Sequence, residues 1–331
     1  MKKVMRLSGF KLIASFFLAA VLSAPAWAAT PALPGSVNYV EGQASIGNEA
    51  LTAKSVGSVN LEAGQTISTG TGKAEVLLTP GVFFRLGDDS AATLVSPSLT
   101  NTEMDLAKGH AMVEVDDIHK DNLLRVQEDG SQTQLLKAGI YGFDAGNGDI
   151  RVFKGEALVQ DGDRQVTLKA GHELTVANEP TTGKLKTAKF DTREYQDSDL
   201  YRFSNLRSEY LAEANVDAAN LYWPGGPGWF GAGWYWDPAF YGYTWIPGNG
   251  WFAGPFGWGF YSPLWVGYAP YYYGRYPYGG RGRTFVTGRA AYARPGYMGR
   301  PGGFRGPTSS AVGASHMGVM TGGFQGGGFH R

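Results

Sequence analysis

The pattern of apolar and polar residues divides the chain into segments of different periodicity. Between residues 34 and 176, short β-favouring runs such as AEVLL at 74–78 alternate with glycines, and no helical period of any length appears. The pattern predicts an all-β body of short strands over residues 35–178. It is followed by one long amphipathic helix and a Gly/aromatic-rich, largely irregular tail.

A short phrase, Leu-x-x-Gly, recurs four times in this body. Successive copies begin 45, 30 and 32 residues apart. Each copy reads as a strand end followed by a tight turn, where glycine adopts positive φ without steric cost. A repeat of this length indicates stacked, β-solenoid-like units, and a sandwich of short strands gives a similar turn spacing. The copies occupy residues 61–64, 106–109, 136–139 and 168–171.

Several ordered motifs in the body are similar to the FecR-type periplasmic domain. They are VNYVEGQASI, LEAGQTISTGTGKAEVLLTPGVFFRLGDDSAATL, DLAKGHAMVEV, GDIRVFKGEALV and LKAGHELTV, within residues 35–176. The family's V-x-G-T-x-F-x-V strand appears here as KAGIYGF at 137–143, without the threonine. The resemblance implies the fold of that domain and an exported, protein-contacting role. FecR-type regulators carry a cytoplasmic anti-sigma segment and a transmembrane helix before this domain. In place of both, we expect a cleavable signal in this sequence. Iron signalling is therefore not implied.

Helical spacing replaces the strand pattern before residue 222. We expect an amphipathic helix within residues 192–221, with Asp197 or Ser198 capping its first turn. An apolar stripe needs a partner, so we expect it to dock on the β body or under the tail, with dimerisation or another protein as the alternative. The stripe consists of Leu200, Phe203, Leu206, Tyr210, Leu211, Ala214, Ala218 and Leu221.

Residues 222–278 are unusually rich in aromatic side chains. Eight of the nine tryptophans of the chain lie between Trp223 and Trp265. Turn signals are frequent, and Asn249-Gly250 between aromatic runs indicates a hairpin. Short strands or a compact aromatic meander are expected here. Residues 279–331 hold mainly Gly and Arg with few aliphatic residues, and this composition predicts a disordered tail.

The N-terminus predicts export. A basic start precedes an apolar run at 12–22 that is too short to span a bilayer, and Ala26-Trp27-Ala28 fits a cleavage site. We expect residues 1–28 to be a signal peptide and the mature chain to hold no transmembrane segment. The location would be the periplasm or the cell surface. The sequence has no cysteine, so disulfides and thiolate metal sites are excluded.

Charge is distributed unevenly. Residues 29–221 hold 17 basic and 28 acidic residues, a balance of −11, whereas residues 222–331 hold eight Arg and one acid, a balance of +7. This asymmetry indicates that the tail contacts an anionic partner or the acidic body. Export argues against nucleic acid and leaves anionic lipid, acidic polysaccharide or the body itself. The arginines of interest are Arg275, Arg281, Arg283, Arg289, Arg294, Arg300 and Arg305.

The tryptophan cluster is the candidate ligand-binding surface. Flat rings could stack on sugars, they could form a small core of their own, or they could enter a membrane interface. In the second case the tail docks on the body, with tryptophans over the helix and arginines against the acidic face. The candidate aromatic platform is Trp234, Trp236, Trp245, Trp251 and Trp258.

Catalysis and metal binding have little support in the sequence. The nucleophile motif G-x-S-x-G and phosphate-binding loops are absent, and His110 and His172 stand in the repeated turns. Residues 116–121 (DDIHKD) hold oxygen and imidazole donors, but a solvated loop is the favoured explanation. GNGD after Asp144 is similar to a calcium-binding turn, but it occurs once without the repetition that such sites need, so a hairpin turn is favoured. We therefore expect no catalytic residues, no metal and no cofactor.

The sequence thus predicts a non-enzymatic envelope protein whose FecR-like domain is an interaction module for an envelope protein or cell-wall polysaccharide. One alternative is a glycan-binding surface protein that uses the tryptophan cluster. Another is the envelope component of a FecR-like sensing system. Peripheral membrane contact is a further possible partnership.

Overall fold

The computed structural model describes residues 32–176 and 183–270. These residues belong to the first of two compact units, Met1–Gly280, and the second unit is Arg281–Arg331. The predicted signal peptide, the predicted disordered tail and the tail arginines all lie outside the described residues. The fold class expected from the sequence is confirmed, because a large β-sheet is followed by one long helix.

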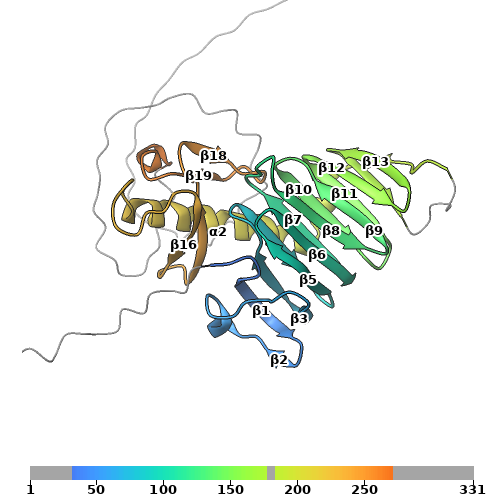
Figure 1. Cartoon of the computed structure of the whole chain (residues 1–331), viewed down its shortest axis with the longest axis horizontal. Helices are drawn as coiled ribbons and strands as arrows, with labels where there is room; N and C mark the ends of the chain where they lie inside the picture. Colours follow the sequence, from blue (N-terminus) through green and yellow to red (C-terminus); the bar gives the residue numbers. More distant parts are fainter. Residues whose placement is uncertain (1–31, 177–182, 271–331) are drawn as a thin grey trace, which may run out of the picture. The chain divides into compact units, whose positions relative to one another are not determined.

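Fifteen strands form the large sheet. Strand β3 pairs with β5 through residues 66–68 and with β4 through residues 74–77, so it joins two arms of the sheet. Strand β1 pairs with β3 and with the short β2, and Figure 1 shows the strands side by side along the sheet. The strands are β1 (Val37–Ile46), β2 (Glu49–Ala50), β3 (Thr66–Leu77), β4 (Val82–Leu86), β5 (Ala91–Ser98), β6 (Asn101–Lys108), β7 (His110–Val115), β8 (Leu123–Glu128), β9 (Ser131–Leu135), β10 (Gly139–Asp144), β11 (Asp149–Lys154), β12 (Glu156–Asp161), β13 (Arg164–Lys169), β14 (His172–Thr175) and β15 (Ala188–Lys189), with the 3-10 turn η1 (Ala53–Ser55) after β2.

The chain alternates between the two arms as it advances. One arm has the order β5-β6-β8-β9-β12-β13 and the other β4-β7-β10-β11-β14-β15, and β6 with β8 is the parallel pair in them. Three copies of the Leu-x-x-Gly phrase end at Gly109, Gly139 and Gly171, where the chain passes from the first arm to the second. Gly109 and Gly171 have φ of 76° and 74°, and a Cβ at Gly139 would lie 2.1 Å from the carbonyl oxygen of Lys154. The repeat therefore marks crossings between the arms, which require glycine.

The main hydrophobic core takes side chains from both arms. Leu94, Val126 and Val159 come from the first arm, and Val113 and Val152 come from the second. Their presence in one buried cluster shows that the arms enclose a common core, as in a sandwich. The sequence left a solenoid and a sandwich open; the winding of the chain is solenoid-like, and the core is sandwich-like.

Two helices follow the sheet, α1 (Thr192–Gln196) and α2 (Asp199–Leu221). The long helix was predicted, but only half of the predicted stripe is buried, namely Phe203, Leu211, Ala214 and Ala218. Leu206, Tyr210 and Leu221 of the predicted stripe are exposed. The buried set is instead small or polar in large part, since α2 contacts β7 on the sheet as well as β16, β17 and β19 of the following segment. It comprises Phe203, Ser204, Arg207, Ser208, Leu211, Ala212, Ala214, Asn215, Val216, Ala218 and Ala219.

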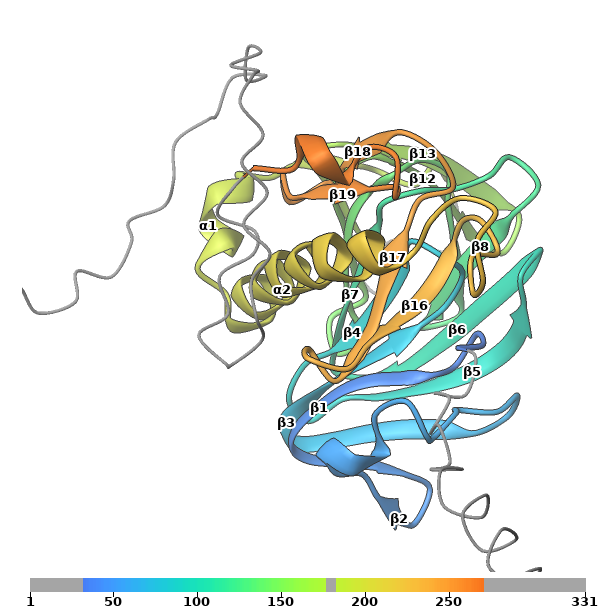
Figure 2. The same ribbon diagram turned by 90° about the vertical axis from the view of Figure 1, so that its left-hand side faces the viewer.

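Two aromatic hairpins cover α2, and Figure 2 shows them beside the helix. The first hairpin pairs β16 (Gly233–Asp237) with β17 (Gly242–Ile246), and the second pairs β18 (Trp251–Ala253) with β19 (Gly259–Tyr261). The 3-10 turn η2 (Val266–Tyr268) follows. A second buried cluster joins these elements to the sheet through Leu77 and Phe83. The aromatic residues therefore act as the core of this region.

A single amide side chain connects both hairpins to the helix. The side-chain amide of Asn215 donates hydrogen bonds to the carbonyl oxygens of Trp245 (2.8 Å) and Tyr261 (3.1 Å). In return, the backbone amide of Tyr261 donates to Asn215 Oδ1 at 2.7 Å. The hydroxyl of Thr244 donates to the carbonyl oxygen of Leu211 at 2.6 Å. These bonds satisfy buried polar groups and fix the hairpins on α2. Among the described residues, no helix is long and apolar enough to cross a membrane.

We predict that two tryptophans of the same segment differ sharply in their contribution to stability. Trp245 is 1 % exposed and packs against Phe252 and Phe260. Trp245→Ala should lower the free energy of unfolding by about 3–5 kcal/mol, because it leaves a cavity. Trp251→Ala is the matched control at an exposed ring and should cost less than about 1 kcal/mol. Urea denaturation measures both, and equal losses would contradict the assignment of Trp245 to the core.

Glu128 gives a second prediction, since it is a buried carboxyl in the β body. Neither of its carboxyl oxygens has a hydrogen-bond partner among the described residues. Burial, and then the charges of Asp129 and Asp144, raise the pKa of Glu128 from 4.5 to about 9. Because the folded protein favours the neutral form of this carboxyl, its contribution to stability is fully present below pH 4.5. That contribution is lost as the pH rises through about 9.

Glu128→Met should therefore raise the free energy of unfolding at neutral pH by about 3 kcal/mol and leave it nearly unchanged in acid. Denaturation curves across the pH range measure the effect. Glu49→Met changes an exposed glutamate and should give a pH profile parallel to that of the wild type. A Glu128→Met profile parallel to the wild type would show that this carboxyl does not titrate as described.

Candidate functional site

The site is built on a cluster of buried charges beneath α2. Arg85 of β4 is fully buried and lies between Glu75 of β3 and Glu114 of β7, with Nε 2.7 Å from the first carboxylate and Nη1 2.7 Å from the second. Arg207 of α2 approaches from the helix side and places Nη2 2.8 Å from Glu75 Oε1. The hydroxyl of Ser208 donates to Glu114 at 2.6 Å. Two carboxylates of the sheet are thus shared by one arginine of the sheet and one of the helix.

The cluster sets the charge state of Glu75. Burial alone would raise the pKa of this carboxyl, but the attraction of Arg207 and Arg85 outweighs burial and lowers it to about 2. Burial raises the pKa of Glu114, and the attraction of Arg85 offsets only part of that rise. Arg207 is therefore the charge that makes the helix side of this cluster electrostatically favourable.

The guanidinium of Arg207 also lies against two aromatic rings. Its Cζ is 4.3 Å from the ring centroid of Tyr39 and 5.0 Å from that of Phe240, within the range of cation–π contacts. Asn38 completes the floor, because its side-chain amide donates to Glu75 (2.9 Å) and to the carbonyl oxygen of Tyr243 (3.0 Å). The backbone amide of Tyr243 donates back to Asn38 Oδ1 at 2.8 Å, which holds the first hairpin against β1.

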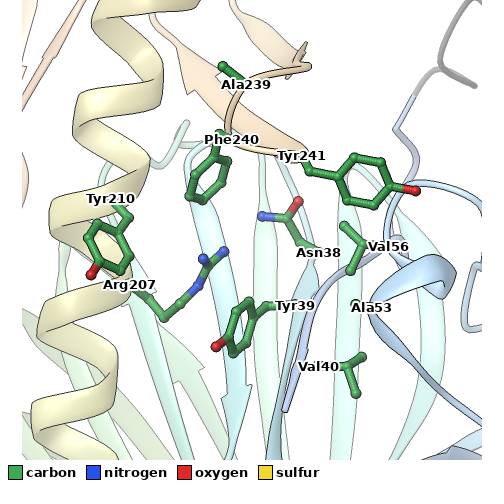
Figure 3. A pocket seen from close by; sticks show the side chains of 10 residues that line it. All are labelled: Asn38, Tyr39, Val40, Ala53, Val56, Arg207, Tyr210, Ala239, Phe240 and Tyr241. Atoms are coloured by element: carbon green, nitrogen blue, oxygen red, sulfur yellow. The ribbon is translucent and has the colours of Figure 1, made fainter. Parts of the chain in front are cut away.

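A cavity of about 350 Å³ opens above Arg207, at the meeting point of β1, η1, α2 and the turn between β16 and β17. Figure 3 shows aromatic side chains from three of these elements around it. Its size lies at the lower end of the range for ligand pockets. The walls are mostly apolar, and the polar groups on the floor are engaged with one another. The lining residues are Asn38, Tyr39, Val40, Ala53, Val56, Arg207, Tyr210, Ala239, Phe240 and Tyr241.

Tyr241 at the rim has an unfavourable backbone conformation. Its φ is 55°, in the left-handed region where a bulky side chain costs about 1 kcal/mol and where glycine is free of strain. Its ring is 53 % exposed and contacts Trp236 edge-on at 5.2 Å. A strained, exposed aromatic residue beside a cavity is the kind of outlier from which a binding role is inferred.

The five tryptophans predicted as an aromatic platform do not form one exposed surface. Trp234 and Trp245 are buried, Trp234 against Phe83 with ring centroids 5.1 Å apart. Trp236 and Trp258 are partly buried in the second core, and Trp251 is 43 % exposed. This arrangement is the one expected if the rings form a core of their own. The tail arginines lie outside the described residues.

The polar groups singled out in the sequence are dispersed in the structure. Asp116 is buried, and burial with the charge of Glu114 raises its pKa. His119 is exposed, 3.7 Å from Asp117. Asp144 accepts hydrogen bonds from the backbone amide of Gly146 and the side chain of Asn147, as in a turn. Within 32–176 and 183–270, no three His, Cys, Asp or Glu side chains are grouped so that they could hold a metal ion.

Sequence reasoning missed the buried charge cluster beneath the cavity. Glu75 and Arg85 are ten residues apart in consecutive strands, but Glu114 and Arg207 come from distant parts of the chain, so no local pattern joins the four. The one available signal was Arg207 itself, which interrupts the predicted buried region of the helix between Phe203 and Leu211. Paired charges are rarely buried without a structural or functional reason.

No protein-family model matches the chain, and no curated protein matches it. Two crystal structures of a "putative anti-sigma factor" from Parabacteroides distasonis are similar to it, at 2.50 and 1.65 Å resolution, each with a TM-score of 0.34. Sequence identity is 15 % and 14 %, and each match covers 40 % of this chain and 62 % of that one. The chain thus spans less than two thirds of the length of these proteins. A likeness at this level carries no argument about function.

We predict that Arg207 holds α2 on the sheet. Arg207→Met leaves the buried carboxylates with one cation, and the free energy of unfolding at neutral pH should fall by about 3–5 kcal/mol. Because the pKa of Glu75 is depressed from 4.5 to about 2, its stabilising contribution is present above 4.5 and is lost as the pH falls through about 2. The variant should lose less stability over that acid range than the wild type.

Arg202→Met provides the control, because it removes an exposed arginine of the same helix. Its stability and its acid profile should match the wild type. Urea denaturation between neutral and acidic pH gives both quantities. An Arg207→Met variant as stable as the wild type would show that the cluster does not hold the helix.

Proposed function

We propose that this chain is a non-enzymatic interaction module of the cell envelope, with a FecR-like body, and that the cavity above Arg207 receives an apolar or aromatic side chain of a protein partner. The observation that carries the proposal is the chemistry of this cavity. Its one cation already pairs with Glu75 and stacks on Tyr39 and Phe240, so the surface offered to a ligand is aromatic and aliphatic. Interface hot spots commonly consist of such a pocket filled by one anchor residue.

The position of the cavity supports a role in binding. It lies where the β body, the helix and the aromatic hairpin meet, so an occupant would contact all three. Tyr241 keeps a strained backbone at the rim although glycine would be unstrained there. The lining holds three tyrosines and Arg207 but no Ser, Cys, His, Asp, Glu or Lys, and Arg207 is already paired with Glu75. The proposed location in the envelope is based on the N-terminal sequence. A role as the envelope component of a FecR-like sensing system is a narrower form of the same proposal.

Photo-cross-linking in intact cells tests this function. We expect p-benzoylphenylalanine in place of Ala53, an exposed lining residue, to yield one discrete cross-linked protein. The same group in place of Leu99, an exposed residue of the loop between β5 and β6 that does not line the cavity, should yield none. Tyr241→Asn combined with the Ala53 probe should reduce the product at least about tenfold, as expected for loss of an aromatic anchor.

The companion measurement is stability, because asparagine tolerates positive φ better than tyrosine does. Tyr241→Asn should remain within about 1 kcal/mol of the wild type, so that loss of the cross-link reports binding. Equal cross-linking from positions 53 and 99, or a product unaffected by Tyr241→Asn, would contradict binding at this cavity.

A further inference from the structure

A second surface of the aromatic segment is apolar and exposed. It lies at the C-terminal end of α2 and on η2, and its side chains take no part in the cavity above Arg207. Leu264 is 58 % exposed and Tyr268 is 70 % exposed, and the rings of Trp265 and Tyr268 are in contact with centroids 5.5 Å apart. We name this surface the η2 face. It consists of Leu264, Trp265 and Tyr268, together with the exposed Leu221 at the end of the helix that η2 contacts.

The backbone holds these residues at one end of the helix. Val266 of η2 is buried in the same cluster as Val216 and Ala219 from the last turns of α2, and η2 contacts that helix. The backbone amide of Val266 donates to the carbonyl oxygen of Ser262 at 2.9 Å, and that of Ser262 donates to Gly250 at 3.0 Å. The η2 face is therefore presented by a packed element, which Figure 2 shows next to β18 and β19.

The composition around the η2 face excludes charge. Residues 238–270 contain no Asp, Glu, Lys, Arg or His, and residues 250–270 contain no Asn or Gln either. The last turns of α2 do carry Glu213 and Asp217, and burial, followed by the charges of Asp237 and Glu213, raises the pKa of Asp217 to about 6. The exposed aliphatic and aromatic side chains thus extend from a segment without charges of its own.

The sequence that follows this face is cationic. The described residues end at Pro270, two residues after Tyr268, and residues 271–331 contain eight Arg and no Lys, Asp or Glu. The first of these arginines, Arg275, comes five residues after Pro270 in the sequence. The exposed Trp, Tyr and Leu side chains are thus followed in the chain by a sequence whose charges are all positive.

We infer that the η2 face docks on the surface of an anionic phospholipid bilayer. Trp and Tyr favour the membrane–water interface, exposed Leu gains from contact with acyl chains, and arginines pair with headgroup phosphates. A polysaccharide fits less well. Leucine has no flat ring to stack on a sugar, and this segment lacks the amide and carboxylate side chains that bind sugar hydroxyls. The inference is independent of the protein-binding cavity, because it uses other residues.

Vesicle co-sedimentation tests the inference, with the chain beginning at Ala29 so that the apolar run at 12–22 is absent. We expect binding to vesicles of phosphatidylcholine with phosphatidylglycerol, and weaker binding to phosphatidylcholine alone. The double variant Leu264→Ser, Trp265→Ser should weaken binding at least about tenfold, because two interfacial side chains are lost. The control Leu99→Ser changes a leucine that is 52 % exposed on the β body and should bind as the wild type does.

Two further experiments separate the apolar and the electrostatic contributions to vesicle binding. Arg275→Gln with Arg281→Gln and Arg283→Gln should reduce the preference for anionic vesicles and its dependence on salt, while the weak binding to neutral vesicles remains. Brominated acyl chains should quench Trp fluorescence in the wild type and less in Trp265→Phe. Unchanged binding by the double variant, absence of vesicle binding, or sedimentation with insoluble cell-wall polysaccharide in place of vesicles would each overturn the inference. Urea denaturation confirms that the variants are folded.

Discussion

The buried charge cluster beneath α2 is the interaction on which the rest of the structure depends. Glu75 of β3 and Glu114 of β7 lie on the two strands that flank β4, and they project onto the same side of the sheet as Arg85. Without Arg207 the cluster would hold two buried carboxylates and one cation. Burying an unpaired charge is far more costly than burying a neutralised group. The position of the helix on the sheet is therefore determined more by the ion pair of Arg207 than by a continuous apolar stripe.

Once α2 is fixed, it organises the aromatic segment. The side chain of Asn215 forms hydrogen bonds with backbone groups of both hairpins. The side chain of Asn38 of β1 forms hydrogen bonds with the backbone of the first hairpin. Each two-stranded hairpin alone would be marginally stable. With the helix as a common support, Trp234 and Trp245 can be buried, and large rings replace the aliphatic residues that a segment so rich in Gly and Pro lacks.

Much of the architecture was evident in the sequence, because strand alternation, glycine turns and helical spacing are local signals. Gly139 illustrates the limit, since its turn was predicted but its close approach to Lys154 depends on the pairing of β10 with β11. The buried face of α2 was predicted only in part for a similar reason. A periodic stripe describes a helix covered on one side, whereas α2 is covered by the sheet and by two hairpins, so that Ser208 and Asn215 are buried while Leu206 is exposed.

The same helix also relates the two proposed binding surfaces. Arg207 at the cavity and Leu221 at the η2 face are 14 residues apart on α2. At 1.5 Å per residue they are about 21 Å apart along the helix axis. Apolar side chains of an interfacial element penetrate only about 5–10 Å into the boundary between headgroups and acyl chains. With the helix axis along the bilayer normal, a bilayer bound at Leu221 would leave the cavity outside the penetrated layer, so both surfaces could be occupied at once.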